Sequence, residues 1–490
     1  MNQAIVEDVV AEVMRRMGGG NGTGRLASAQ STGSPARHEP AGQSHRPNMP
    51  DGEYGIFSKV DDAVSAATDS QKKLVRLSMD DRDAIVKLIK STAKQHARTW
   101  GEIELQETKI GRLDHKIEKL QILELVPGVE FLRTGATGGS NGVCLEDYSP
   151  FGVIGIITPV THSVPTLSAN AINMVASGNA IVANPHPSGT NCAAIAVREY
   201  NRLIAAKYGI EHLITCIVPP TLESAEAIFH HRGIPLLVVT GGPAVARAAL
   251  AAKKRAIVAG PGNPPVIVDE TACLVNAAGS IVKGGAYDNN LLCIGEKEVF
   301  CVSSVFGDLM NQMTQSGGYV LNGQQIEALT KVAFTKGDDG KPHVNKQFVG
   351  KDAAVLARSI GLDVPPTTQL LVGETDADHA FVQEEQMMPF IPFVRVRDVN
   401  EAMDRALQAE HGFRHTALMH SRNMDRVTKF GRMANTTLYV INGPSMAGLG
   451  LGGQGYLSYS IATPTGEGIT TPLTFTRYRR TMITGAMRMI

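Results

Sequence analysis

Residues 151–189 read FGVIGIITPVTHSVPTLSANAINMVASGNAIVANPHPSG, and this stretch decides the fold class. A continuous apolar run at 152–157 is followed by a helical segment from Thr166, and a second apolar run comes at 179–184. Strands that are apolar throughout and alternate with helices are typical of a parallel sheet covered on both faces. The stretch therefore predicts an α/β fold.

The same alternation continues toward the C-terminus. Apolar runs at 214–218, 235–241 and 255–260 alternate with helices predicted from Ser188, Leu222 and Pro243. After a helix from about Thr271 to Gly285, a second set follows, with runs at 264–269, 296–305, 369–374, 392–398, 416–421 and 438–443. A chain of 490 residues is too long for one ordinary core, so we expect two or three domains.

Charge and cysteine usage exclude several classes of protein. Lys+Arg and Asp+Glu are equal at 47 each, which gives no electrostatic footprint for nucleic acid or an anionic membrane. The segment from Asp147 to Arg198 has no charged side chain between its ends, but polar residues, Gly and Pro interrupt it too often for a membrane span. The six cysteines show no metal-ligand spacing, so we expect reduced thiols in a cytosol and no metal site.

The N-terminal region divides into three segments. Residues 1–17 place Ile5, Val6, Val9, Val10, Val13, Met14 and Met17 on one helical stripe, which predicts a short amphipathic helix. Residues 18–52 are rich in Gly, Pro and Ser and predict a flexible linker. Residues from about 53 to 135 have a helical period.

Three turns after predicted strands are candidate ligand sites. They are TPVTHSVP (158–165), NPHPSG (184–189) and TGGPAV (240–245). Each presents backbone N–H groups near a helix start, where phosphate or developing negative charge is stabilised. None is a G-x-G-x-x-G motif, so each can also be a plain tight turn.

Cys293 lies in NNLLCIGEK (289–297), between a polar bend and a strand-like run. By itself it is either a nucleophile or a buried small apolar side chain.

Further stretches carry a family resemblance: ITPVTHSVPT, GNAIVANPHPSG, LLVVTGGPAV, AGPGNPPVIVDE, IVKGGAYDNNLLCIGEKEV, MMPFIPFVRV, HTALMHSRN and GLGLGGQGYLSYSIATPTGEG. With them the chain, from about Tyr54 onward, resembles the aldehyde dehydrogenase superfamily, and most closely the CoA-acylating acetaldehyde and propionaldehyde dehydrogenases of bacterial microcompartments. The resemblance implies a Rossmann-type cofactor domain at 53–260 with oligomerisation strands near 125–150, an α/β catalytic domain at 261–445, and a C-terminal return and oligomerisation segment at 446–490.

The resemblance also implies the site. Cys293 would be the nucleophile, and its N–H would form the oxyanion site with His162. NAD would be the cofactor and coenzyme A the co-substrate, with Glu385 at the nicotinamide ribose. The other expected cofactor-binding residues are Thr158, Pro159, His186, Pro187, Ser188, Thr240, Gly241, Gly242 and Val245. The expected reaction converts propionaldehyde, or else acetaldehyde, to the acyl-CoA.

Two departures from the superfamily pattern matter. His162 stands where the superfamily usually has Asn; its imidazole either donates to the oxyanion or is a satisfied polar side chain. Hydrolytic members carry a water-activating Glu in a Glu-Leu-Gly-Gly pattern, whereas RAIVAGPGNPP (255–265) has no acid. We therefore expect water to cleave the thioester only slowly and another thiol to accept the acyl group. The alternatives are a hydrolytic or phosphate-coupled aldehyde dehydrogenase, or a non-catalytic cargo scaffold of the same fold.

The resemblance extends to partners and location. The helix at 1–17 is similar to encapsulation peptides, which would dock it on a shell or cargo protein inside a cytoplasmic microcompartment; the alternative is an arm used in oligomer packing. The family is oligomeric, which implies a homodimer or homotetramer. The C-terminal segment at 470–489 can pair as an edge strand with another subunit or pack as an ordinary strand.

Overall fold

The computed structural model describes residues 49–337, 340, 342–485 and 487. The expected helix at 1–17 and the expected linker up to residue 48 lie outside these described residues. Among the helices that are described, none is both long enough and apolar enough to cross a membrane.

The first sheet is parallel and has six strands in the order β1-β6-β5-β4-β7-β8. The predicted apolar runs are confirmed as strands within one or two residues. No pattern in the sequence predicts β1, because two residues carry no periodic signal. The strands are β1 (Ile56–Phe57), β4 (Val153–Thr158), β5 (Ala180–Pro185), β6 (Ile214–Ile217), β7 (Leu236–Thr240) and β8 (Arg255–Ala259).

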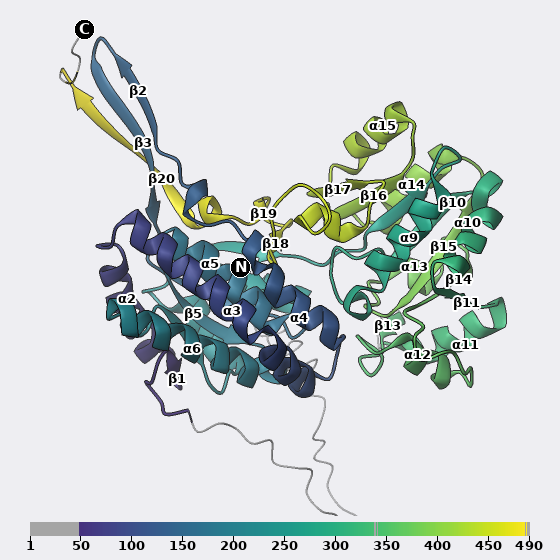
Figure 1. Ribbon diagram of the computed structural model, residues 1–490, viewed down its shortest axis with the longest axis horizontal. Helices are drawn as coiled ribbons and strands as arrows, with labels where there is room; N and C mark the ends of the chain where they lie inside the picture. Colours follow the sequence, from purple (N-terminus) through teal and green to yellow (C-terminus); the bar gives the residue numbers. More distant parts are fainter. Residues whose placement is uncertain (1–48, 338–339, 341, 486, 488–490) are drawn as a thin grey trace, which may run out of the picture.

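Helices cover both faces of this sheet (Figure 1). All residues of α5 are buried, since α3 packs over it. Together with the buried β4 and β5, this burial explains the lack of charged side chains from 153 to 185. The helices are α2 (Val60–Leu74), α3 (Met79–Thr108), α4 (Leu113–Gln121), α5 (Ser163–Ala176), α6 (Thr190–Tyr208), α7 (Leu222–His230) and α8 (Pro243–Ala251).

The second sheet is also parallel and has seven strands in the order β11-β14-β15-β10-β9-β16-β17. Along β9, Val266 and Val268 join one apolar cluster while Ile267 joins another, so both faces of the sheet are buried. The strands are β9 (Pro265–Val268), β10 (Glu298–Val302), β11 (Gly318–Val320), β14 (Leu370–Thr375), β15 (Phe390–Val396), β16 (Thr416–His420) and β17 (Leu438–Ile441).

Seven helices of the described chain accompany the second sheet. Buried residues of α9 and α10 contribute to one of the two clusters, and those of α14 and α15 to the other. The helices are α9 (Leu274–Gly285), α10 (Ser303–Gln315), α11 (Gly323–Ala333), α12 (Ala353–Ser359), α13 (Ala380–Gln383), α14 (Val399–Ala409) and α15 (Met424–Ala434).

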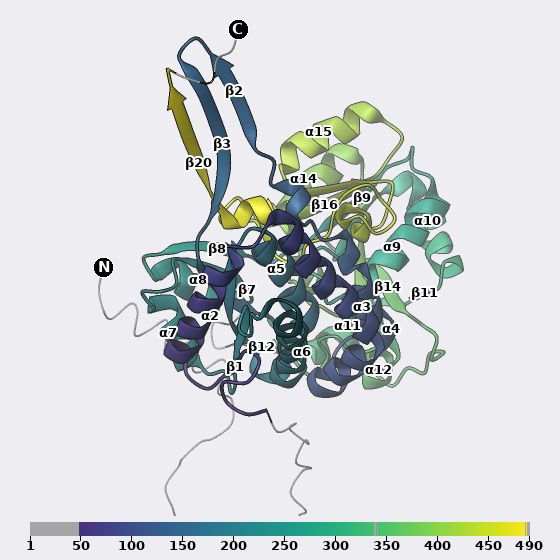
Figure 2. The ribbon, with the colours of Figure 1, turned by 60° about the vertical axis from the view of Figure 1, so that its left-hand side comes forward.

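A three-stranded antiparallel arm projects away from both sheets (Figures 1 and 2). It consists of β2 (Gly135–Gly139), β3 (Gly142–Pro150) and the C-terminal β20 (Thr476–Thr484). β20 pairs with β3 of its own chain along its whole length. Two short hairpins, β12 (Phe334–Lys336) with β13 (Pro342–Val344) and β18 (Ile461–Ala462) with β19 (Gly468–Ile469), complete the described strands.

Candidate active site

Three neighbouring strands of the first sheet end at one edge. β4 ends at Thr158, β5 at Pro185 and β7 at Thr240, in the order β5-β4-β7. The chain winds outward from β4 through β5 and β6 and then returns to β7 on the other side of β4. Ligands of doubly wound sheets bind where the winding reverses, at the carboxyl ends of the strands. The fold therefore brings the three candidate turns to one crevice edge.

The groups at this edge fit a dinucleotide such as NAD. A Cβ added at Gly242 would meet no atom within 4 Å, so open space lies beside the backbone where α8 begins. Such a helix start offers N–H groups to a phosphate. The hydroxyl of Thr158 is buried without a hydrogen-bond partner among the described residues.

The remaining expected cofactor residues differ in their freedom to bind. Thr240 shares a hydrogen bond with Ser460, Oγ1 to Oγ at 2.8 Å, which occupies its side chain. The ring of His186 accepts a hydrogen bond from the backbone N–H of Ser188 at 3.1 Å. Partly or fully exposed residues complete the set: Pro159, Pro187, Ser188, Gly241 and Val245.

Cys293 lies at the edge of the second sheet that is formed by the amino ends of the strands, in the loop that precedes β10. It follows α9 and a 3₁₀ turn, η4 (Tyr287–Asn290), and precedes β10. The loops that precede β9, β15 and β16, which neighbour β10 or β9 in the sheet, carry Asn263, Glu385 and His415. The amino ends of four adjacent strands, β15, β10, β9 and β16, therefore lie at the edge that carries Cys293.

The cysteine loop also packs into the first sheet's core. Leu292 and Ile294 are buried members of that apolar cluster, and half-buried Cys293 packs against it. Behind the cysteine, a Cβ at Gly262 would lie 2.4 Å from the carbonyl oxygen of Cys293 and 3.0 Å from Cγ of His415. The close approach of these loops requires glycine at this position.

The thiol is neutral at rest. Burial raises the pKa of Cys293 to about 12, and the Glu385 carboxylate adds to the rise, whereas Lys297 opposes it. Burial also raises the pKa of Glu385 to about 7. Because the pKa of Glu385 is much the lower of the two, Glu385 is the ionised neighbour above neutral pH.

Buried polar groups without partners surround the loop. His415 donates or accepts through Nδ1 with Thr416 Oγ1 at 2.9 Å, but its Nε2 has no partner among the described residues. Burial lowers the pKa of His415 to about 4, so its ring is neutral. Both carboxyl oxygens of Glu298 are likewise buried without a partner in the part of the chain that the structure describes. Burial raises the pKa of Glu298 well above its ordinary value.

His162 caps the start of α5 and is buried. Its Nε2 lies 3.1 Å from Thr161 Oγ1, and its Nδ1 has no partner among the described residues. Burial lowers the pKa of His162 well below its ordinary value, which leaves a neutral ring with one N–H. This state suits a hydrogen-bond donor to an oxyanion, and the role expected from the sequence stays a prediction.

The strand end that would carry a water-activating carboxylate has none. Ala259, the last residue of β8, pairs with Thr240, and a Cβ at Gly260 would lie 2.6 Å from Pro464 Cγ. The carboxylate whose charge raises the pKa of the Cys293 thiol is that of Glu385, in the loop before β15.

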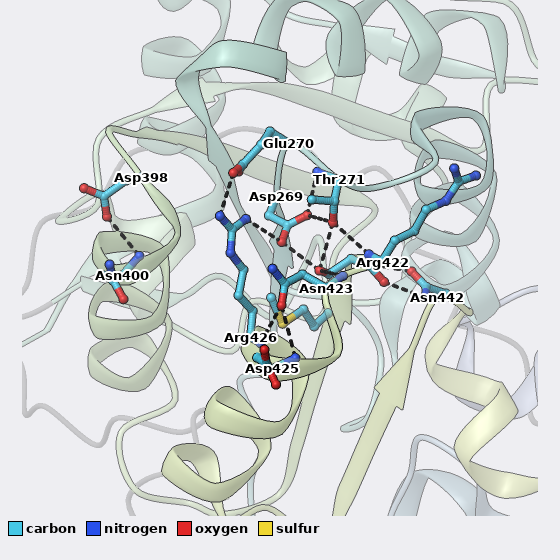
Figure 3. A network of polar contacts seen from close by, with 12 residues as sticks. Asp269, Glu270, Thr271, Asp398, Asn400, Arg422, Asn423, Asp425, Arg426 and Asn442 are labelled. Carbon is cyan, nitrogen blue, oxygen red and sulfur yellow. Dashed lines mark hydrogen bonds and ion pairs between the residues drawn. The ribbon is translucent and has the colours of Figure 1, made fainter.

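The carboxyl edge of the second sheet carries a separate network (Figure 3). Asp269 is fully buried and accepts hydrogen bonds from Thr271 Oγ1 at 2.6 Å, Ser421 Oγ at 2.7 Å and Arg426 Nη1 at 3.0 Å. Arg426 also donates to Glu270 at 2.7 Å. These groups satisfy one another, so the network is structural.

Sequence reasoning missed Lys297 and His415. The Nζ of Lys297 donates to the carbonyl oxygens of Asn290 at 2.8 Å and Leu292 at 3.1 Å, and so closes the loop around Cys293. A charged residue four positions after a cysteine was the available signal for Lys297. For His415 the sequence offered only the boundary of a strand.

Comparisons with known proteins agree with this geometry. The model of the aldehyde dehydrogenase family matches residues 37–456. The acetylating acetaldehyde dehydrogenase EutE of Salmonella typhimurium is 40% identical and covers 100% of both chains. A propionaldehyde dehydrogenase from the fucose utilisation microcompartment of Clostridium phytofermentans has a TM-score of 0.86 at 39% identity, over 89% of this chain and 100% of that one.

A second solved structure carries ligands. The propionaldehyde dehydrogenase of Rhodopseudomonas palustris, with bound CoA and an acylated cysteine, has a TM-score of 0.85 at 39% identity, over 88% of this chain and 98% of that one. Since the family model spans most of the sequence and these relatives span nearly all of both chains, this chain belongs to the aldehyde dehydrogenase family.

Proposed function

We propose that this chain oxidises a short-chain aldehyde with NAD and transfers the acyl group from Cys293 to coenzyme A. The observation that carries the proposal is a half-buried cysteine packed beside the segment 255–265, which has no carboxylate to activate water. The names of the relatives support it, since they are acetylating or propionaldehyde dehydrogenases and one binds CoA with its cysteine acylated.

The first half of the reaction forms a thioester. The Cys293 thiol loses its proton to Glu385, the carboxylate whose charge acts on the pKa of the thiol, and its sulfur bonds to the aldehyde carbon. The carbonyl oxygen becomes an oxyanion, which the N–H groups of Cys293 and His162 stabilise. The turns 158–165 and 240–245 would hold NAD, which would accept the hydride that leaves the same carbon.

The second half releases the product. The sulfur of coenzyme A bonds to the thioester carbon, and the bond from that carbon to Cys293 breaks. Cys293 leaves with the electron pair and takes up the proton that the coenzyme A thiol has given up, and the acyl-CoA departs. A thiolate is a far better nucleophile toward a thioester than unassisted water, which makes the missing carboxylate in 255–265 consistent with this route.

A burst experiment tests the proposal. Aldehyde and NAD without coenzyme A should give about one NADH per active site and then almost stop, because the stranded thioester blocks the thiol. Adding coenzyme A should restart steady turnover. Sustained NADH formation without it, with free carboxylate accumulating, would instead place the chain in the hydrolytic class, and phosphate dependence would indicate the phosphate-coupled class.

The substrate is proposed as propionaldehyde, with acetaldehyde as the second candidate. Both occur in the names of the relatives. Comparison of kcat/KM for the two aldehydes decides between them, and a higher value for acetaldehyde would reverse the assignment.

Location and assembly are further parts of the proposal. We propose that residues 1–17 direct the chain to a microcompartment shell or cargo protein, supported by the microcompartment origin of a structural relative. Deleting 1–17 should abolish compartment association of a fused reporter and leave turnover intact; lost turnover would contradict this role. The projecting arm supports a homodimer or homotetramer, which light scattering of the full chain tests.

A further inference from the structure

The turn that leads into Cys293 has an unusual backbone. Asp288, Asn289 and Asn290 all have positive φ, at 49°, 57° and 64°. Side chains other than glycine rarely adopt this left-handed region, although Asn and Asp tolerate it best. Three consecutive residues in it persist only where their surroundings hold them.

Each of the three side chains is held by a different part of the molecule. Asp288 pairs through Oδ2 with Lys119 Nζ of α4. Asn289 donates to Asp352 Oδ1 at 2.9 Å, next to α12. Asn290 donates to Glu296 O at 2.8 Å within the cysteine loop itself. All three residues are at most 1% exposed, so water cannot replace these contacts.

The contact between Asp288 and Lys119 joins the cysteine turn to α4, a helix that packs with the first sheet. Asp288 Oδ1 also accepts from the Arg112 N–H at 2.8 Å, and the Asp288 N–H donates to His115 Nδ1 at 2.9 Å. The side chains of Lys119 and Asp288 are fully buried. Burial by itself would raise the pKa of Asp288, but Lys119 and Lys116 lower it to about 2, which keeps the carboxylate ionised.

The same residue of α4 also reaches the other half of the site. The carbonyl oxygen of Lys119 accepts a hydrogen bond from Tyr459 at 3.1 Å. The ring of Tyr459 lies 5.9 Å from the ring of His162, centroid to centroid. Lys119 therefore touches, through its side chain, the turn that carries the cysteine and, through its backbone, the residue packed on the candidate oxyanion donor.

We propose that Lys119 is a positioning residue for Cys293: its ion pair with Asp288 holds the left-handed turn 288–290 and thereby aims the thiol between the two sheets. The proposal rests on Cys293 being the nucleophile of the proposed function. A purely structural pair would stabilise the fold without affecting the reactivity of the thiol.

The test compares three variants with a control. Lys119→Met removes the pair and leaves a buried charge, Asp288→Asn removes the charge of the turn, and the double variant leaves no unpaired charge. Arg426→Met removes another ion pair of a buried carboxylate, that of Asp269 at the carboxyl edge of the second sheet. Exposed Cys273 is an internal reference for alkylation.

Three quantities are measured: kcat with the KM for NAD, the iodoacetamide alkylation rate of Cys293 relative to Cys273 by mass spectrometry, and the melting temperature. Lys119→Met and the double variant should lower kcat about 10²-fold, the scale for a misplaced reacting group, with little change in KM. The ratio of the Cys293 to the Cys273 alkylation rate should change in the same variants in which kcat falls. Arg426→Met should lower only the melting temperature.

The double variant separates the two roles, including the case in which Lys119→Met does not fold. It should regain much of the melting temperature while kcat stays low. If it regains kcat as well, or if Lys119→Met leaves kcat and the alkylation ratio unchanged, the pair is structural and the proposal is overturned. In the protein without substitutions, full alkylation of Cys293 that leaves turnover intact would instead contradict the proposed function.

Discussion

The two edges of the second sheet differ in how their polar groups are satisfied. At the carboxyl edge, Asp269 has a partner for each oxygen (Figure 3). At the amino edge, the oxygens of Glu298 and one ring nitrogen of His415 are buried without partners among the described residues. Unpaired buried polar groups are expensive, so they persist mainly where function requires them. The contrast marks the amino edge as the reactive one.

Two side chains are exceptions at the carboxyl edge: Thr375 at the end of β14, whose hydroxyl is buried without a partner among the described residues, and His420 at the end of β16. Both of its ring nitrogens are buried without a partner in the described chain, and burial lowers its pKa to about 4, which keeps the ring neutral. The contrast therefore rests on the carboxyl groups: Glu298 at the amino edge has no partner for either oxygen among the described residues, whereas Asp269 at the carboxyl edge has one for each.

The contrast also limits a general rule. Ligands of open α/β sheets bind at carboxyl strand ends, and the cofactor residues proposed in the turns after β4, β5 and β7 would follow this rule. The second sheet reverses it, because its amino edge packs into the core of the first sheet through Leu292 and Ile294. A site between two sheets can therefore combine the carboxyl edge of one sheet with the amino edge of the other.

The largest effect is expected at the thiol. Cys293→Ser should abolish both the NADH burst and steady turnover, because the serine hydroxyl is a much weaker nucleophile at neutral pH. Binding of NAD, measured by fluorescence titration, should remain. Cys273→Ser and Cys301→Ala serve as controls and should retain turnover. A burst that survives in Cys293→Ser would show that the nucleophile does not lie at the amino edge of the second sheet.

A smaller effect is expected across the crevice. His162→Ala should lower the rate of the burst by roughly 10²-fold, the usual scale for the loss of one oxyanion donor. His162→Asn should keep much of the rate, since its amide can donate as well. Stopped-flow measurement of NADH gives both values. Near-normal rates in both variants would assign His162 to structure.

The carboxyl edge should respond in stability alone. Arg426→Met leaves the buried Asp269 with fewer donors, and we expect a loss of about 1–3 kcal/mol in the free energy of unfolding. Denaturant titration measures this loss, and kcat should stay within about twofold of the parent, since surface and structural changes distant from a site leave it intact. A strong fall in kcat without loss of stability would show that both edges serve the reaction.

The smallest effect concerns the pH dependence. Glu385 loses its proton near pH 7, so the burst rate should rise through that pH as the carboxylate becomes available to the thiol. Glu385→Gln should remove this inflection and slow the burst several-fold. The same change removes a negative neighbour, so simple alkylation of Cys293 should become faster at a given pH above neutrality. Slower alkylation in this variant would contradict the electrostatic coupling.

The sequence by itself determined the elements that rest on local patterns. Strands buried on both faces are continuous apolar runs, so the runs at 152–157 and 438–443 matched β4 and β17 closely. The turns after β4, β5 and β7 were located for the same reason. The family resemblance singled out Cys293, because its neighbours in NNLLCIGEK are specific.

Only the tertiary structure decided which edge of the second sheet is reactive and what holds the cysteine loop. Lys119 and Asp288 are 169 positions apart, and no period or spacing in the sequence relates them. The same holds for His415, which meets the loop of Cys293 only because β16 pairs with β9 and Gly262 leaves room between them. Local patterns record how a segment is buried, whereas the partners of a buried charge depend on which distant segments the packing of the two sheets brings into contact.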